Sequence, residues 1–234
     1  MKQLALFASP EQACSYLPDR QAQLLFIDPH LPEMEMQAQY HNLIQKGFRR
    51  TGDLIYRPGC AHCNECQPSR IPVQSFKPNR TQRRVWNKNK DLQIQKVRPT
   101  AKEETLALYR AYQFARHPKE EEIEPSDDYL HFLTSRWSDT WFLEFRLQKK
   151  LLCVGVIDQT TTGLSAVYTF FDPTQDQRSL GSLAVLTEIE LARELDLPYL
   201  YLGYWIKDCD KMNYKSRFQP LELLREGVWA AFSL

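Results

Sequence analysis

Residues 164–205, LSAVYTFFDPTQDQRSLGSLAVLTEIELARELDLPYLYLGYW, decide the fold of this chain. The stretch contains two strand-like segments, and a polar loop and then a helical segment lie between them. A helix between neighbouring strands predicts a mixed α/β sheet. We predict strands at 141–147, 151–158, 164–171 and 199–205, a connecting turn at 159–163 and a helix at 182–195.

Toward the N-terminus the pattern is less regular. Pro32 and Gly47 bracket a predicted helix at 33–46, because proline favours helix starts and glycine favours helix ends. The segment 48–80 carries several prolines, so we expect it to be rich in loops. We divide the chain into a Cys-rich, loop-rich and basic N-terminal module, 1–98, and an α/β domain, 99–234; within the module a helix is predicted near 81–90 and a strand at 93–98.

The composition is that of an ordinary globular protein. The chain has 234 residues, of which 43% are hydrophobic and 25% are charged. No apolar run approaches the roughly 18 residues of a membrane span, and the first ten residues do not resemble a secretory signal. We therefore expect a cytoplasmic protein without a membrane partner, in which thiols stay reduced.

The first chemical motif is a cluster of cysteines, Cys60-Ala-His-Cys63-Asn-Glu-Cys66. Two successive C-x2-C spacings on one loop suit a zinc ion or an iron–sulfur cluster, and both metals remain open. A fourth ligand is needed, for which Cys14 and His62 are the candidates. The alternative is a loop of three thiols that binds no metal.

The second motif is a basic stretch. Residues 70–98 contain nine Lys or Arg and one acidic residue, a local charge of +8, although the net charge of the chain is only +1. Guanidinium groups match phosphate geometry, and Trp86 offers a ring for stacking on a base. The alternative is a solvated helix face with Trp86 packed into the core. We predict a polyanion-binding face formed by Arg80, Arg83, Arg84 and Lys88.

Two further groups lie in the C-terminal half. Arg178, Gly181 and Ser182 lie at the start of the predicted helix, where backbone N–H groups could cradle a phosphate. The alternative is that Ser182 is only an N-cap and Gly181 only a turn residue. Gly203 interrupts the last predicted strand and suggests a bulge. Three cations follow that strand closely and favour a site at its end: Lys211, Lys215 and Arg217.

Several of these motifs together resemble arginyl-tRNA–protein transferases. The N-terminal resemblance lies in Cys14-Ser-Tyr-Leu-Pro18, in Arg50-Thr-Gly-Asp-Leu-Ile-Tyr-Arg57-Pro58, in the cysteine cluster and in the arginine run at 80–84. The C-terminal resemblance lies in Gly203-Tyr-Trp-Ile206, Lys211-Met-Asn-Tyr-Lys215 and Arg217-Phe-Gln-Pro220. The chain is similar in length to the bacterial, leucine-transferring branch. It departs from eukaryotic relatives at Leu17, where those carry a second cysteine, which leaves Cys14 as the favoured fourth ligand.

The resemblance implies a reaction and a fold. The reaction is transfer of leucine from leucyl-tRNA to the N-terminal Asp or Glu of a protein, which tags that protein for N-end rule degradation. Arginine transfer is less favoured. The implied fold is a GNAT-like acyltransferase core, and the chemistry requires no cofactor, since an amine attacks an already activated ester.

We assign roles on that basis. The cations of 80–88 hold the tRNA, and the loop of Arg178, Gly181 and Ser182 seats the terminal phosphate. A backbone N–H near Tyr168 or Thr169 stabilises the oxyanion. Tyr204 or Glu188 is the optional general base. The acceptor carboxylate binds among Arg49, Arg57, Lys211, Lys215 and Arg217, and Cys14, Cys60, Cys63 and Cys66 are the metal candidates.

A GNAT-type N-acetyltransferase that uses acetyl-CoA is the alternative. A loop with Arg and Gly before a helix suits a pyrophosphate equally well. Such an enzyme has no need of the +8 segment, which is the feature that favours tRNA.

Overall fold

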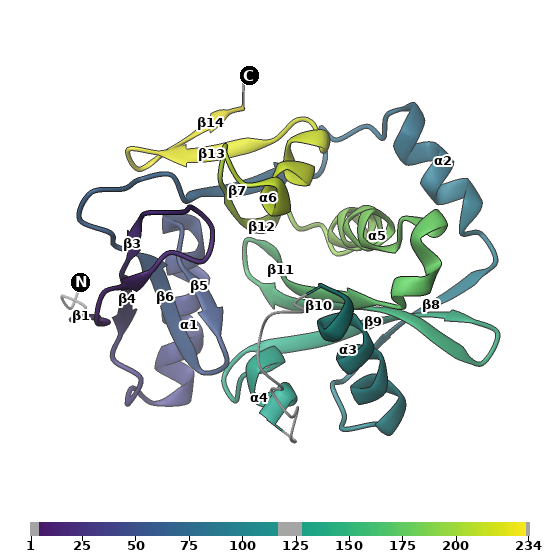
Figure 1. Cartoon of the computed structure of the whole chain (residues 1–234), viewed down its shortest axis with the longest axis horizontal. Coiled ribbons are helices and arrows are strands. Elements are labelled where there is room, and N and C mark those ends of the chain that lie inside the picture. Colours follow the sequence, from purple (N-terminus) through teal and green to yellow (C-terminus); the bar gives the residue numbers. More distant parts are fainter. Residues whose placement is uncertain (1–4, 117–127, 233–234) are drawn as a thin grey trace.

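A mixed sheet forms the centre of the computed structural model, which describes residues 5–116 and 128–232 (Figure 1). Within these residues the sheet has eight strands in the order β14-β13-β7-β12-β11-β10-β9-β8. All strands predicted in the C-terminal half are present, so the mixed α/β fold is confirmed. The strands are β7 (Gln67–Pro72), β8 (Leu92–Val97), β9 (Asp139–Leu147), β10 (Lys150–Thr160), β11 (Gly163–Phe171), β12 (Tyr199–Trp205), β13 (Glu222–Arg225) and β14 (Val228–Ala231).

Helices cover both faces of this sheet (Figure 1). On one face α5 (Leu180–Glu194) connects β11 to β12, which run parallel, as expected of a GNAT-like core. Its apolar side chains join those of β9, β10 and β12 in the largest buried cluster. The opposite face is covered by α3 (Glu103–Arg116) and α4 (Asp128–Leu133). The helix α2 (Arg80–Lys88) packs against α5 rather than against the sheet.

The N-terminal residues form a second, smaller sheet in the order β1-β4-β6-β5. The prediction that 48–80 is loop-rich is wrong in part, because β5, β6 and β7 lie within it. Pro58 and Pro72 are the last residues of β6 and β7, and a strand end tolerates the missing N–H. The elements are β1 (Leu6–Ala8), β4 (Leu24–Ile27), α1 (Glu33–Leu43), η1 (Ile44–Lys46), β5 (Arg49–Thr51) and β6 (Leu54–Pro58), with a separate hairpin of β2 (Gln12–Ala13) and β3 (Gln21–Ala22).

The large sheet draws strands from both sides of residue 98. β7 pairs with β12 and β13, and β8 pairs with β9, so two strands of the predicted N-terminal module lie in the sheet of the α/β domain. The two predicted parts of the chain thus share one sheet, and their division at residue 98 stays a prediction. None of the helices in the described segments is long and apolar enough to cross a membrane.

Candidate active site

The parallel strands β11 and β12 separate after a short paired stretch. Their register runs from Gly163↔Tyr199 to Ser165↔Tyr201, although both strands continue further along the chain. β12 is irregular at this point in its pairing with β7, and Gly203 has φ +78°, a conformation that glycine adopts without strain. We call the unpaired region between 166–171 and 202–205 the β11–β12 divergence.

Arg49 lies at the point where the pairing of β11 and β12 ends. Its guanidinium donates to Ser165 Oγ at 2.9 Å, to the Ala166 carbonyl and to the Tyr201 carbonyl at 3.5 Å. The side chain thus comes from β5 of the small sheet and ties together the two strands of the large one. We predicted that Arg49 binds an acceptor carboxylate, but its donors are directed to these strands instead.

Glu188 lies on α5 and is completely buried, with 0% of its surface exposed. Both carboxylate oxygens lack a hydrogen-bond partner among the described residues. The space for the carboxylate comes from Gly155 of β10, where a Cβ atom would lie 3.2 Å from Oε1. Burial raises the pKa of Glu188 to about 8, although Arg49 acts in the opposite direction. The sequence thus pointed to an unusual carboxyl, one that is mostly in its protonated form at pH 7.

Tyr204, the other predicted base, is unsuited to accept a proton. Its hydroxyl donates to the Gly47 carbonyl at 2.9 Å, and burial raises its pKa well above the ordinary tyrosine value. The proposal that Tyr204 is the base is therefore withdrawn, because a buried phenol that donates to a carbonyl is a structural group.

Lys215 is also buried and sits beside the same strand. Its Nζ donates to the Tyr204 carbonyl and to Met212 Sδ. Burial, and after it the charge of Arg49, lower the pKa of Lys215 to about 7. A buried amine that donates to a backbone carbonyl is poorly placed to bind an incoming carboxylate from solvent.

Strand geometry distinguishes the two backbone N–H groups that the sequence offers as oxyanion donors. The N–H of Asp172 donates to the Leu152 carbonyl of β10 at 2.8 Å. Because successive residues of a strand direct their N–H groups to opposite sides, the N–H of Tyr168 faces β10 and that of Thr169 faces the divergence. Of the two candidates that the sequence offered, Thr169 is the one in position.

The predicted acceptor cations are not brought together as one set. Arg57 lies on β6 with its guanidinium 5.2 Å from the centre of the Phe48 ring, and it is exposed. Lys211 and Arg217 are exposed on the segment after β12. These three remain accessible to a ligand.

The predicted basic face lies on α2. Arg80, Arg83, Arg84 and Lys88 are all exposed, and no salt bridge to any of them occurs among the described residues. Trp86 is 37% exposed, which excludes the alternative that it is part of the core. The helix starts at a capping box between Asn79 and Gln82.

The same helix bridges the two segments that leave the divergence. Near its start, Gln82 Nε2 donates to the Arg217 carbonyl at 3.0 Å, in the segment that follows β12. Just past its end, Asn89 Nδ2 donates to the Arg178 carbonyl at 2.9 Å, in the segment that follows β11. The basic helix is therefore fixed at both ends to the side of the sheet on which β11 and β12 separate.

The predicted phosphate loop differs in detail from our expectation. Arg178 forms two hydrogen bonds to Asp91, at 2.9 and 2.8 Å, so its charge is already paired. The helix begins at Leu180, and the preceding residue is Ser179 with φ +53°; Ser182 is thus within the first turn and is not the N-cap. Gly181 faces the Phe171 ring, from which a Cβ would lie 3.3 Å.

Four cysteines line a cavity of about 680 Å³ beside the small sheet: Cys14, Cys60, Cys63 and Cys66. Burial raises the pKa of Cys66 to about 12, and Cys60 adds to the shift. Among the residues in the described ranges, however, no group of three or more His, Cys, Asp or Glu side chains is close enough together to hold a metal ion. The thiols thus share a cavity without forming a finished ligand set, and metal binding stays a prediction.

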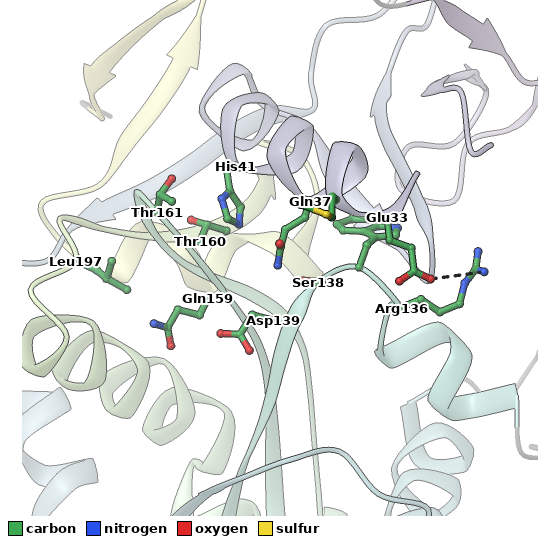
Figure 2. A pocket seen from close by; sticks show the side chains of 12 residues that line it. Glu33, Gln37, His41, Arg136, Ser138, Asp139, Gln159, Thr160, Thr161 and Leu197 are labelled. Atoms are coloured by element: carbon green, nitrogen blue, oxygen red, sulfur yellow. Dashed lines mark ion pairs between the residues drawn. The ribbon is translucent and has the colours of Figure 1, made fainter. Parts of the chain in front are cut away.

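A second cavity, of about 630 Å³, lies at the opposite end of the strand pair. Figure 2 shows His41 and Gln37 of α1 facing Gln159 and Asp139 of the sheet. Thr161 and Leu197 also line it, and these residues directly precede β11 and β12. The cavity is therefore remote from the divergence along both strands, and we do not assign the reaction to it.

The sequence missed two parts of the site. Gly155 gave a signal, since a glycine inside a strand marks a close approach by another group. Tyr214 lies within a motif that we singled out, but we gave it no role. The residue as a whole is 39% exposed, but its phenol group is enclosed, and both this burial and the Glu188 carboxyl raise the pKa of the phenol.

Comparisons with known proteins bear on most of the chain. A family model described as "Arginine-tRNA-protein transferase, N terminus" matches residues 12–84, and one described as "Arginine-tRNA-protein transferase, C terminus" matches residues 104–225. A protein of Nitrosococcus oceani named aspartate/glutamate leucyltransferase is 49% identical over 96% of this chain and 94% of its own length. A protein of Pseudomonas putida W619 with the same name is 47% identical over 100% of this chain and 99% of its own length.

Two solved structures are similar at a lower level. One is the C-terminal domain of a putative lysylphosphatidylglycerol synthetase from Agrobacterium fabrum, with a TM-score of 0.48 and 13% identity over 64% of this chain and 49% of its own. The other is L-PGS from Bacillus licheniformis, with a TM-score of 0.46 and 13% identity over 74% of this chain and 52% of its own.

Proposed function

The chain belongs to the arginine-tRNA–protein transferase family, and from that premise we propose that it transfers leucine from leucyl-tRNA to the N-terminal Asp or Glu of a protein. The observation that carries the proposal is the identity of 45–49% to relatives named aspartate/glutamate leucyltransferase, over nearly the whole chain. Such transfer would tag the acceptor for N-end rule degradation. The substrates are an aminoacylated tRNA and a protein, and we infer that the reaction takes place in the cytoplasm.

The reaction is aminolysis of an ester. The neutral α-amine of the acceptor attacks the leucyl carbonyl carbon, a C–N bond forms, and the C–O bond to the tRNA ribose breaks. The proton lost by the amine ends on the ribose hydroxyl, so the step needs no oxidant or cofactor. An α-amine with a pKa near 8 is partly neutral at pH 7, and alignment of the reactants supplies a large part of the acceleration.

The tRNA would bind along α2. Four exposed cations on one helix, none with a salt bridge in the described part of the chain, suit a run of phosphates, and the helix ends are fixed beside the β11–β12 divergence. The terminal ribose and its leucyl ester would then reach the divergence, where the Thr169 N–H would stabilise the developing oxyanion. Arg178 would contribute less charge than expected, because Asp91 neutralises it.

The acceptor would use the cations that remain accessible. Arg57, Lys211 and Arg217 are exposed, whereas Arg49 and Lys215 are engaged with backbone carbonyls. We propose that the side-chain carboxylate of the acceptor binds one of the first three. This supports acidic N-termini as substrates, since a neutral residue would leave those cations unpaired.

The cysteines have no part in these steps. We propose that zinc or an iron–sulfur cluster, held by Cys14, Cys60, Cys63 and Cys66, would stabilise the fold around the cavity. Metal analysis of protein purified without oxygen tests this. A metal-to-protein ratio near one that falls on Cys63→Ser supports the site, and metal-free protein at full activity overturns it.

One experiment tests the function. The protein is incubated with radiolabelled leucyl-tRNA and peptides that start with Asp, Glu or Ala, and in parallel with arginyl-tRNA or acetyl-CoA. We expect labelled product only from leucyl-tRNA and only on the Asp and Glu peptides. Turnover of acetyl-CoA in place of leucyl-tRNA would overturn the proposal in favour of an N-acetyltransferase.

A further inference from the structure

The carboxyl of Glu188 is completely buried and has no hydrogen-bond partner among the described residues. Among the described residues both oxygens are enclosed and unbonded, while the other buried acidic side chains are all paired: Asp158 with Arg50, Glu144 with Lys102 and Arg146, and Asp172 with Lys150. An unpaired buried carboxyl lowers the free energy of unfolding of a protein. Such a group in a native structure therefore needs an explanation. The Glu188 carboxyl is therefore available to accept a hydrogen bond from a donor group on a bound ligand.

The position of Glu188 points to the divergence. Its carboxylate lies against Gly155, and Gly155 pairs with Thr169, the residue whose N–H faces the divergence. The titratable groups that act on or respond to Glu188 are Arg49 from β5, Cys153 from β10 and Tyr214 from η3 (Tyr214–Arg217). Of these, Arg49 is a cation, and its hydrogen bonds go to Ser165 and to backbone carbonyls.

The reaction needs two primary amines to be treated differently. The acceptor amine must lose its proton to act as the nucleophile. The α-amine of the donor leucine must not attack, and as an ammonium group it also makes the neighbouring ester carbon more electrophilic. A buried carboxylate beside one of the amines stabilises its charged form and so distinguishes the two.

We propose that Glu188 binds the α-ammonium group of the aminoacyl donor at the floor of the β11–β12 divergence, so that the enzyme requires a donor with a free amine. We assign Glu188 to the donor, and not to the acceptor, because its carboxyl lies deep below the protein surface. A carboxyl with no exposed surface suits the small tip of the tRNA, whereas the acceptor arrives on a polypeptide chain beside exposed cations. Tyr214, which is partly exposed and near Glu188, is the side chain that a donor would displace.

The inference rests on the proposed function for the identity of the donor, but its test does not require transfer. The probe is 3′-leucylamido-3′-deoxyadenosine, in which an amide replaces the ester, and its N-acetyl form serves as the uncharged match. Calorimetry measures the binding of both probes to the whole protein. We expect wild type to bind the free-amine probe about 10- to 100-fold more tightly, which corresponds to one charge-assisted hydrogen bond.

Glu188→Gln should bring that ratio close to one, and Glu188→Asp should leave an intermediate value. The control is Glu190→Gln on the same helix, whose side chain is 43% exposed and pairs with Arg193; it should keep the wild-type ratio. A structural role would not change a ratio between two probes. The proposal is overturned if wild type binds both probes equally, a result that needs no variant to fold, or if Glu188→Gln retains the preference.

The two proposals fail in different ways. Protein that shows the amine preference but transfers no leucine to Asp peptides would overturn the function and support the role of Glu188. Protein that transfers leucine equally well from leucyl-tRNA and N-acetyl-leucyl-tRNA would do the opposite.

Discussion

Arg50 and Asp158 form an ion pair in which both side chains are 0% exposed. Arg50 Nε and Nη2 each lie 2.6 Å from a carboxylate oxygen of Asp158. Thr140 and Tyr40 also donate to this carboxylate, so it is fully satisfied. Because Arg50 is on β5 and Asp158 is on β10, the pair joins the small sheet to the large one beside the residue, Arg49, that holds the divergence.

Arg50→Ala should therefore lower the free energy of unfolding by about 3–5 kcal/mol, since it leaves Asp158 buried without a counter-charge. Arg98→Ala is the matched control, because its pair with Asp139 has side chains that are 59% and 33% exposed. That change should cost less than about 1 kcal/mol. Urea unfolding of both variants measures the difference, and equal losses would contradict the role of the buried pair.

Charge reversal of Arg83 and Arg84 should weaken tRNA binding and make it less sensitive to salt. Each lost phosphate contact lowers the slope of log K against log salt by roughly 0.9. We expect a decrease of about 2 for the double variant, measured by filter binding between 50 and 300 mM salt. Arg20→Glu, another exposed arginine in the N-terminal hairpin region, serves as the control. An unchanged slope would exclude α2 from the tRNA surface.

Gly203 and Gly227 provide a matched pair of glycines. Both have positive φ, +78° and +79°, so alanine should cost about 1–2 kcal/mol of stability at either. A Cβ at 203 would lie 3.4 Å from the Arg49 guanidinium, whereas nothing lies within 4 Å of one at 227. Gly203→Ala should therefore also reduce the rate of leucine transfer. Thermal unfolding and transfer assays on both variants check this, and equal activities would contradict it.

Lys215 should make stability depend on pH on the alkaline side. Burial lowers its folded pKa from 10.5 to about 7, so between these values the unfolded chain binds more protons than the folded one. The free energy of unfolding should then rise as the pH increases from about 7 toward 10.5, as the folded protein escapes the cost of a buried charge. Lys215→Met should flatten this rise. Urea unfolding at several pH values measures it, and parallel curves for the two proteins would refute the buried charge.

Much of the fold could be predicted from local patterns. Alternating apolar residues and turn residues predict the strands at 141–171, the helix after them and the strand at 199–205. Each of these signals lies inside its element or within a few residues of it. The short strands β5 and β6 escaped prediction, because segments of three and five residues are too short to show a clear alternation. Their pairing depends on partners far away in the chain, which no local window contains.

The sequence by itself determined the family, the mixed α/β order and the exposed basic helix, since each depends on residue types at fixed spacing. The tertiary structure alone decided which of the chemical residues are available. It directed Arg49 and Lys215 to backbone carbonyls, paired Arg178 with Asp91 and enclosed Glu188 without a hydrogen-bond partner among the residues that the structure describes. The physical reason is that a hydrogen-bond partner and a degree of burial are properties of the surroundings of a side chain, and contacts between distant segments create those surroundings.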